Sequence, residues 1–435
     1  MLTDRLPFVS LMTLSLLACS PAVQAQATAR RAASPASRMV VKNAYEPSGP
    51  VPTASLLPSP ILSGPGYYLA ETSVANGLDN DYTLVTNSGV FTAHGNGQLA
   101  RRIAEVRAIA ALEQMSNTSE FGEGLRRTGL EKVDDIVGVV RDPVGTVRSI
   151  PKGLRQFGKR AKETIRGERD PHDASRVDQA LSVDKARREI AASLGVDPES
   201  DNTVLREQLN RVAWVRAMAG LGLNIASAQL APAQVALGLT VVNVTGTLHD
   251  AALTRTPGEV REAALASLQR LGVSRSTARR FLDNPAFTTL QLADISDKLA
   301  AIGSSPTMDL FVNWMNSANT PADAAFMDGT AGLVAAYAQR SAPVKRFFRA
   351  GPMLVFEDAG GNVVVPAFRD YIIWTQANAA RADKLRALRA QGGNAPVVVL
   401  VSGLVSPMTL QQAEARGVRL VWNIANQPSL LGPLR

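Results

Sequence analysis

A helical repeat of apolar residues runs through the middle of this 435-residue chain and limits the folds that it can form. From Gln98 to about Ala342, apolar side chains recur every three or four residues, as they do on one face of an α-helix. The flanking segments 67–93 and 353–422 contain β-branched and aromatic runs between Asn-Gly or Gly-Gly turns. The sequence therefore predicts an α+β fold: a mainly α-helical central region, a small N-terminal β element and a C-terminal β-hairpin-αβαβ unit.

Capping residues support the helices that the periodicity predicts. Ser182, Thr203 and Ser274 each stand at the start of a periodic segment, where a hydroxyl accepts a bond from the first turn. The expected helices span 98–115, 130–141, 144–166, 183–194, 203–230, 232–253, 257–271, 274–282 and 289–302. The polar run 168–175 predicts a linker inside this mainly helical domain, which we place at 67–345.

The segment 217–248 has no formal charge over 32 residues, which raises the alternative of a membrane span. Pro232 divides it into pieces of 15 and 16 residues, and both are shorter than the ~20 residues that a bilayer needs. We therefore expect two buried helices here and no transmembrane helix in the mature chain.

The C-terminal unit, 351–425, is expected to hold a small sheet. A helix separates the predicted strands 397–401 and 418–422, so this crossover makes them parallel. Ser402 and Asn423 follow these two strands directly and would border a crevice at their carboxyl ends, where open α/β sheets bind ligands. We expect a long helix from Ala367 after the hairpin, and the N-terminal β element to complete the sheet.

The N-terminus carries an export signal. Residues 6–18 form an uncharged run of 13 residues, long enough for the core of a signal peptide and too short to span a bilayer. Val23-Gln24-Ala25 offers the small residues that ordinary signal peptidase needs. Leu16-Leu17-Ala18-Cys19 is similar to the lipobox of bacterial lipoproteins, in which the cysteine takes up a lipid.

Both cleavage sites stay open, giving a signal peptide at 1–25 or a lipoprotein signal at 1–18 with lipidation of Cys19. Either one predicts export, to the periplasm or to the outer membrane as an anchored lipoprotein. The Pro-, Ser- and Ala-rich stretch 26–66 then predicts a flexible linker, because it is poor in residues that bury apolar surface.

A basic segment at 141–169 contains nine basic and three acidic residues, a local net charge of 9 − 3 = +6. If this segment is helical, it presents a basic amphipathic face suited to anionic lipid or lipopolysaccharide, and the alternative is a solvated charged face. Nucleic acid is not an expected partner of an exported protein, whereas another envelope protein is. Six basic residues recur at steps of four and three and form the candidate anion or membrane site: Arg148, Lys152, Arg155, Lys159, Lys162 and Arg166.

Few residues are available for catalysis or metal binding. One cysteine and three histidines exclude a disulfide framework and a four-cysteine zinc site, and no histidine pair has ligand spacing. Gly95-Asn96-Gly97-Gln98-Leu99-Ala100 matches a dinucleotide-binding spacing, but a turn that leads into a helix is favoured. We expect no cofactor and no metal. The sequence favours a binding or assembly role in the cell envelope, and the enzyme alternative is an envelope hydrolase with its site at the carboxyl ends of strands 397–401 and 418–422.

Overall fold

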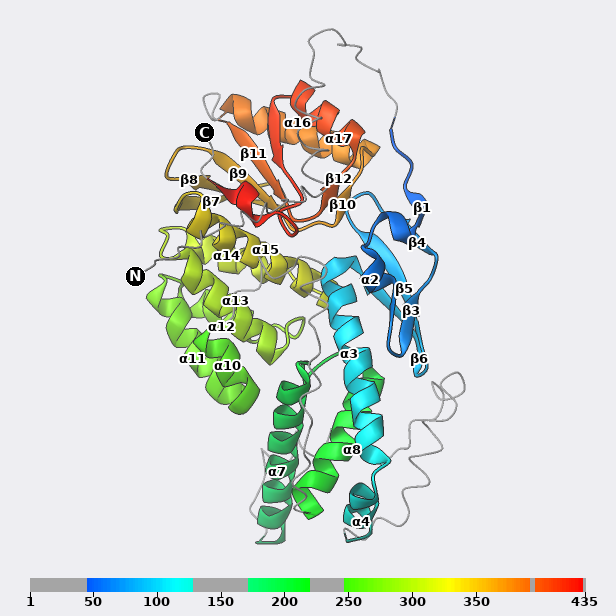
Figure 1. Cartoon of the computed structure of the whole chain (residues 1–435). Coiled ribbons are helices and arrows are strands. Elements are labelled where there is room, and N and C mark those ends of the chain that lie inside the picture. The colour runs from blue at the N-terminus through cyan, green and yellow to red at the C-terminus, as the bar shows by residue number, and fades with distance from the viewer. Residues whose placement is uncertain (1–44, 128–170, 220–245, 392–395, 433–435) are drawn as a thin grey trace, which may run out of the picture. The chain divides into compact units, whose positions relative to one another are not determined.

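The computed structural model describes residues 45–127, 171–219, 246–391 and 396–432. Its α+β architecture confirms the predicted fold class, with an N-terminal antiparallel sheet, central helices and a C-terminal mixed sheet (Figure 1). The expected helices at 130–141 and 144–166 lie outside the described residues, as does most of 220–253. Within the described residues, no helix combines the length and the apolar character that crossing a bilayer requires.

The N-terminal sheet has six strands in the order β1-β4-β5-β3-β2, and β6 pairs with the other edge of β5. All of its pairings are antiparallel. Its strands are β1 (Gly49–Pro52), β2 (Ser63–Gly64), β3 (Tyr67–Leu69), β4 (Thr72–Ala75), β5 (Asn80–Thr86) and β6 (Gly89–His94). The expectation that these strands complete the C-terminal sheet is wrong, because they pair only with one another.

The predicted linker 26–66 differs from the structure in its last part. After β1, the chain forms a 3-10 turn, Thr53–Ser55, and the short helix α2 (Ser59–Leu62). Leu57 and Ile61 from this part are buried in the main hydrophobic cluster, because these isolated apolar residues cover the inner face of the sheet. Residues 46–66 are therefore not a flexible linker, although their proline and serine content predicts one.

Helix α3 (Gly95–Ser116) begins directly after β6, with no loop between them. Its apolar face, including Leu99, Ile103 and Val106, packs in the same cluster as Tyr82 and Leu84 from the inner face of the sheet (Figure 1). The predicted periodicity of 98–115 is confirmed, and it exists because one side of the helix covers this sheet.

The central helices form two cores. Helices α4, α7 and α8 pack with the second half of α3, whereas α11 to α15 share the main cluster with residues of both sheets. The helices are α4 (Ser119–Arg127), α7 (Pro171–Leu194), α8 (Thr203–Ala219), α10 (Thr247–Thr254), α11 (Pro257–Arg270), α12 (Arg275–Leu282), α13 (Thr289–Ile302), α14 (Met308–Met315) and α15 (Pro321–Arg340).

Capping explains why several predicted helix starts are accurate to within a residue. Thr256, Thr288 and Thr320 each form a reciprocal capping box, and Ser274 accepts a bond from the amide of Thr277. The linker predicted at 168–175 is wrong for its second half, because α7 already begins at Pro171. Proline is tolerated there since the first turn of a helix has no partner for its amide.

The C-terminal sheet has five strands in the order β13-β11-β9-β8-β7. Strands β11 and β13 are parallel, as the crossover argument predicts. Strand β9 is also parallel to β11, and β8 and β7 extend the sheet in antiparallel fashion. Its elements are β7 (Val344–Ala350), β8 (Met353–Asp358), β9 (Val363–Ala367), α16 (Gln376–Gln391), β11 (Val397–Val401), α17 (Pro407–Ala415) and β13 (Val418–Val421). Two short strands, β10 (Tyr371–Ile372) and β12 (Leu404–Val405), form a separate parallel pair, and a 3-10 turn, Pro428–Leu431, follows β13.

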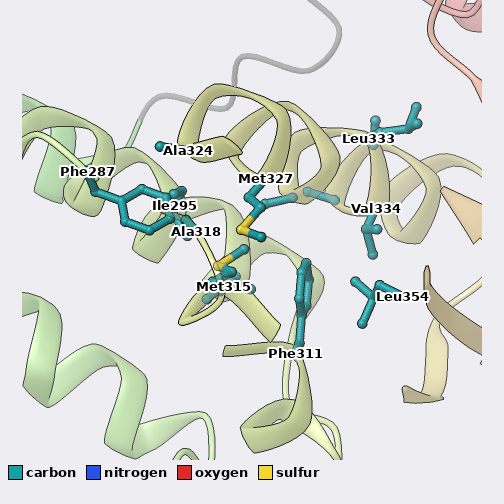
Figure 2. Close-up of a cluster of buried hydrophobic side chains, with 14 of the residues drawn as sticks. Phe287, Ile295, Phe311, Met315, Ala318, Ala324, Met327, Leu333, Val334 and Leu354 are labelled. Carbon is teal, nitrogen blue, oxygen red and sulfur yellow. The ribbon is translucent and has the colours of Figure 1, made fainter. Parts of the chain in front are cut away.

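One hydrophobic cluster joins the helices to this sheet. Figure 2 shows Phe311, Met315 and Met327 from α14 and α15 gathered near Leu354 of β8. The ring of Phe311 also lies 4.8 Å, centroid to centroid, from that of Phe347 on β7. Aromatic and thioether groups fill irregular spaces well. This cluster therefore fixes the helices against the face of the sheet opposite to α16 and α17.

Candidate functional site

A small chamber, lined about equally by polar and apolar residues, lies at the carboxyl end of β11. It is bordered by the N-terminal sheet, the first turn of α3 and the loops that follow β9, β11 and β13. Its cavity volume is about 40 Å³, enough for a few water molecules. The polar residues that line it are Asn80, Asn96, Asp370, Tyr371 and Asn426.

The turn between β4 and β5 is hydrogen-bonded to the loop after β9. The amide of Tyr371 donates to the carbonyl of Leu78 at 3.2 Å, and the amide of Ile373 donates to the carbonyl of Gly77 at the same distance. Asn378 on α16 also donates to the carbonyl of Gly77, at 2.7 Å. These bonds bring residues from opposite ends of the chain to one site.

Asp370 caps helix α3 from a distance of 274 positions in the chain. Its Oδ2 accepts a hydrogen bond from the amide of Asn96 at 2.8 Å, whereas the residue at the ordinary capping position, His94, provides no side-chain bond. A Cβ on Gly95 would lie 2.7 Å from the same oxygen, so glycine is required there. The Gly-x-Gly segment is thus a turn into a helix, as predicted, and the group at the helix N-terminus is a carboxyl of the chain itself.

Asp79 places a second carboxyl beside Asp370. Its Oδ1 accepts a bond from the amide of Asp370 at 3.3 Å, and its Oδ2 forms an ion pair with Arg369 at 2.5 Å. The guanidinium of Arg369 lies 3.9 Å from the centroid of the Phe326 ring, which holds it in place by a cation–π contact.

Burial raises the pKa of the Asp370 carboxyl to about 8, and the negative charge of Asp79 adds to this shift. The amides of Asn96 and Asn80 and the charge of Arg369 act in the opposite direction but do not offset it. Asp370 therefore holds a proton at neutral pH. Carboxylic acids with a raised pKa in a cavity are candidates for proton transfer or for binding linked to proton release.

Tyr82 connects two amide side chains at the edge of the chamber. Its hydroxyl donates to Asn96 Oδ1 at 2.8 Å and accepts a bond from Asn80 Nδ2 at 3.2 Å. Burial and the nearby Asp370 hold the pKa of this hydroxyl well above its ordinary value, so it keeps its proton. Asn80 as a whole is only 2% exposed. Its side-chain oxygen Oδ1 is buried and has no hydrogen-bond partner among the described residues.

The structure brings together the loops of the two residues predicted to border the crevice. The amide of Asn423 donates to the carbonyl of Gly403 at 2.6 Å, and that of Ala425 donates to the carbonyl of Ser402 at 2.9 Å. The hydroxyl of Ser402 donates to the carbonyl of Arg369 at 2.8 Å, so it supports the loop after β9. Asn423 adopts a left-handed backbone with φ of 60° and accepts a bond from Asn426.

No local pattern in the sequence points to Asp370, Asp79 or Asn80. The helix expected from Ala367 begins only at Gln376, and the eight residues between them form β10 and the loop that carries Asp370. The signal was present, since Asp370 follows β9, which is parallel to β11, and the ends of parallel strands meet at one edge. The hairpin pattern of β8 and β9 is the stronger local signal, and it does not reveal that β9 also pairs with β11.

Other predicted sites lie elsewhere. Cys19 and all six basic residues from Arg148 to Arg166 fall outside the described residues. Of the histidines, His94 pairs with Asp81 at 2.6 Å on the surface, and His249 pairs with Asp294 between α10 and α13. Across the described ranges, no group of three histidine, cysteine or acidic side chains has metal-binding geometry.

No protein-family model, curated protein or solved structure matches this chain. The chemistry of the chamber is therefore inferred from its geometry.

The pKa of Asp370 predicts an unusual pH dependence of stability. An aspartate titrates near 3.8 in the unfolded chain, so between that pH and about 8 the folded state binds one proton more than the unfolded state. The free energy of unfolding should fall as pH rises through this window, by up to about 1.4 kcal/mol per pH unit. Asp370→Asn, which cannot ionise, should remove this slope.

Urea unfolding at pH 5, 6, 7 and 8 measures the effect. The exposed carboxylate of Asp283 gives the matched control, and Asp283→Asn should keep the wild-type slope. Parallel profiles for wild type and Asp370→Asn would show that Asp370 is ionised throughout.

Proposed function

We propose that the protein is an exported bacterial cell-envelope protein with a binding or assembly role, and that the chamber is its ligand site. The signal-like N-terminus supports export, and one observation carries the ligand site. Asn80 Oδ1 is a buried acceptor without a partner among the described residues, in a residue that lines the chamber beside Asp370. Leaving such a group unpaired costs about 1–3 kcal/mol, so a ligand that donates a hydrogen bond to it gains that free energy.

The chamber fits a single small donor group, such as a primary amine at the end of a larger molecule. Its cavity volume of about 40 Å³ has room for only a few atoms the size of a water molecule, so the body of the ligand would remain outside. An ammonium group supplies N–H donors to Asn80 Oδ1 and places positive charge beside the carboxyls of Asp79 and Asp370. Arg369 already compensates Asp79, so Asp370 is the carboxyl that the ligand would neutralise.

Binding of an amine would therefore be linked to loss of the Asp370 proton. Below the raised pKa of this carboxyl, the proton must leave before the ion pair forms. Affinity for the ammonium should increase with pH from 6 to 8, by up to about tenfold per unit. A neutral hydroxyl ligand would not require this proton release.

Ethylamine and its neutral analogue ethanol test the proposal, with NMR shifts of the chamber amides as the readout. Ethylamine should bind more tightly as pH rises, and Asp370→Asn and Asn80→Leu should each weaken it by about tenfold or more, the value of a lost charge-assisted bond. Asn210→Leu, at an exposed site on α8, is the control and should bind normally. Equal binding of ethanol and ethylamine at every pH would contradict the charge argument.

A second candidate is an envelope hydrolase whose site would lie in the same chamber, at the carboxyl end of β11. The observation in its favour is the pair Asp79 and Asp370, because two adjacent acids in unlike environments are the usual arrangement of a general acid and its partner. Incubation with purified peptidoglycan would then release soluble fragments, at a rate that falls above about pH 8 and is lost in Asp370→Asn. Equal release by wild type and variant would exclude Asp370 as the acid.

Export is tested by the intact mass of the protein purified from cell envelopes. A mature chain that begins at Cys19 with attached lipid would establish the lipoprotein, whereas a start at Gln26 would establish ordinary cleavage. A chain that retains Met1 and is recovered from the cytosol would contradict export.

A further inference from the structure

Strand β6 is an open edge of the N-terminal sheet. The opposite edges are protected, because β1 contains Pro50 and Pro52 and β2 is only two residues long. β6 has six residues and contains no proline, lysine, arginine, aspartate or glutamate. Among the described residues it pairs only with β5, so its other side has no strand beside it.

The register identifies the backbone groups that face this open side. In an antiparallel pair, alternate residues direct their N–H and C=O groups away from the neighbouring strand. The amide of His94 donates to Gln98 Oε1 at 2.6 Å rather than to β5, so His94 is one of the outward residues. By alternation, Thr92 and Val90 are the others, and no described residue bonds to their backbone groups.

An apolar row on the outer face of the sheet ends at the same edge. Tyr68, Val85 and Val90 lie side by side on β3, β5 and β6. Tyr68 is 56% exposed and Val90 is 64% exposed, which is unusual for side chains of this size. A strand added next to β6 would continue this row and cover Val90.

We propose that two copies of this chain pair through β6 in antiparallel fashion, about a twofold axis at Phe91. In that register Val90 of one copy exchanges both backbone bonds with Thr92 of the other, and the reverse pair is equivalent by symmetry. The outward N–H and C=O groups of Val90 and Thr92 are thus paired in both copies. The two Phe91 residues then occupy the central position, where side chains of an antiparallel pair approach most closely.

Composition favours a second copy over an unrelated partner. Residues 89–93 carry no charge, so self-pairing brings no like charges together. Val90 and Thr92 are both β-branched and share the outer face, so pairing each with the other in the second copy places two β-branched side chains side by side across the new edge. The resulting interface is isologous, the form that closed dimers require.

Sedimentation equilibrium of the full mature chain tests the proposal over a wide range of protein concentration. A dimer is expected. Thr92→Pro should give a monomer that melts at the temperature of wild type diluted to its monomeric state, because the amide that it removes is not bonded to β5. Thr92→Val, which keeps the backbone groups and the shape of the side chain, is the matched control and should remain dimeric.

Hydrogen exchange and a second variant complete the test. The amides of Val90 and Thr92 should exchange slowly in the dimer and quickly on dilution. If Thr92→Pro fails to fold, Val90→Lys provides the monomer, because an edge lysine opposes strand addition without changing the ladder to β5. A wild-type chain that is monomeric at every concentration, or a dimer that Val90→Lys leaves intact, would overturn the proposal.

Discussion

The hydrogen bond from the Asn96 amide to the Asp370 carboxyl is the contact on which the chamber depends. It fixes the first turn of α3, which covers the N-terminal sheet, to the loop that leaves β9 of the C-terminal sheet. The bonds from Tyr371 and Ile373 to the β4–β5 turn reinforce the same junction. Without Asp370, the amide of Asn96 in the first turn of α3 would lose this acceptor, and the side chain of His94 supplies none.

Two opposing effects act on this carboxyl. The helix N-terminus and the backbone amides favour its charged form, whereas burial and the negative charge of Asp79 favour its neutral form. The second pair of effects is larger, so the capping group holds a proton at neutral pH. An asparagine would cap the helix without this conflict, and a residue that carries such a cost is a reasonable candidate for function.

Regular structure was predictable where the signals are local. The capping threonines and the apolar periodicity of α11, α12 and α13 lie within a few residues of each other, and the valine-rich strands β11 and β13 were evident as a parallel pair. The chamber was not predictable in this way. Asp370 caps a helix 274 positions away, and the loop that carries it was assigned to a helix because residues 367–389 are rich in alanine and arginine. The rule that parallel strands end at one edge led to the loops of Ser402 and Asn423, whose neighbours Gly403, Leu404, Ala425 and Asn426 line the chamber while these two residues do not.

Strand β6 passes directly into helix α3. The strand carries the open sheet edge, and the first turn of the helix contacts Asp370. The outward amides of β6 end at His94, and Asn96, which donates to Asp370, is two residues further on. No loop lies between them to absorb a displacement. A substitution that shifts the first turn of α3 against Asp370 would therefore also displace the end of β6, so the association state of chamber variants has to be measured alongside their ligand binding.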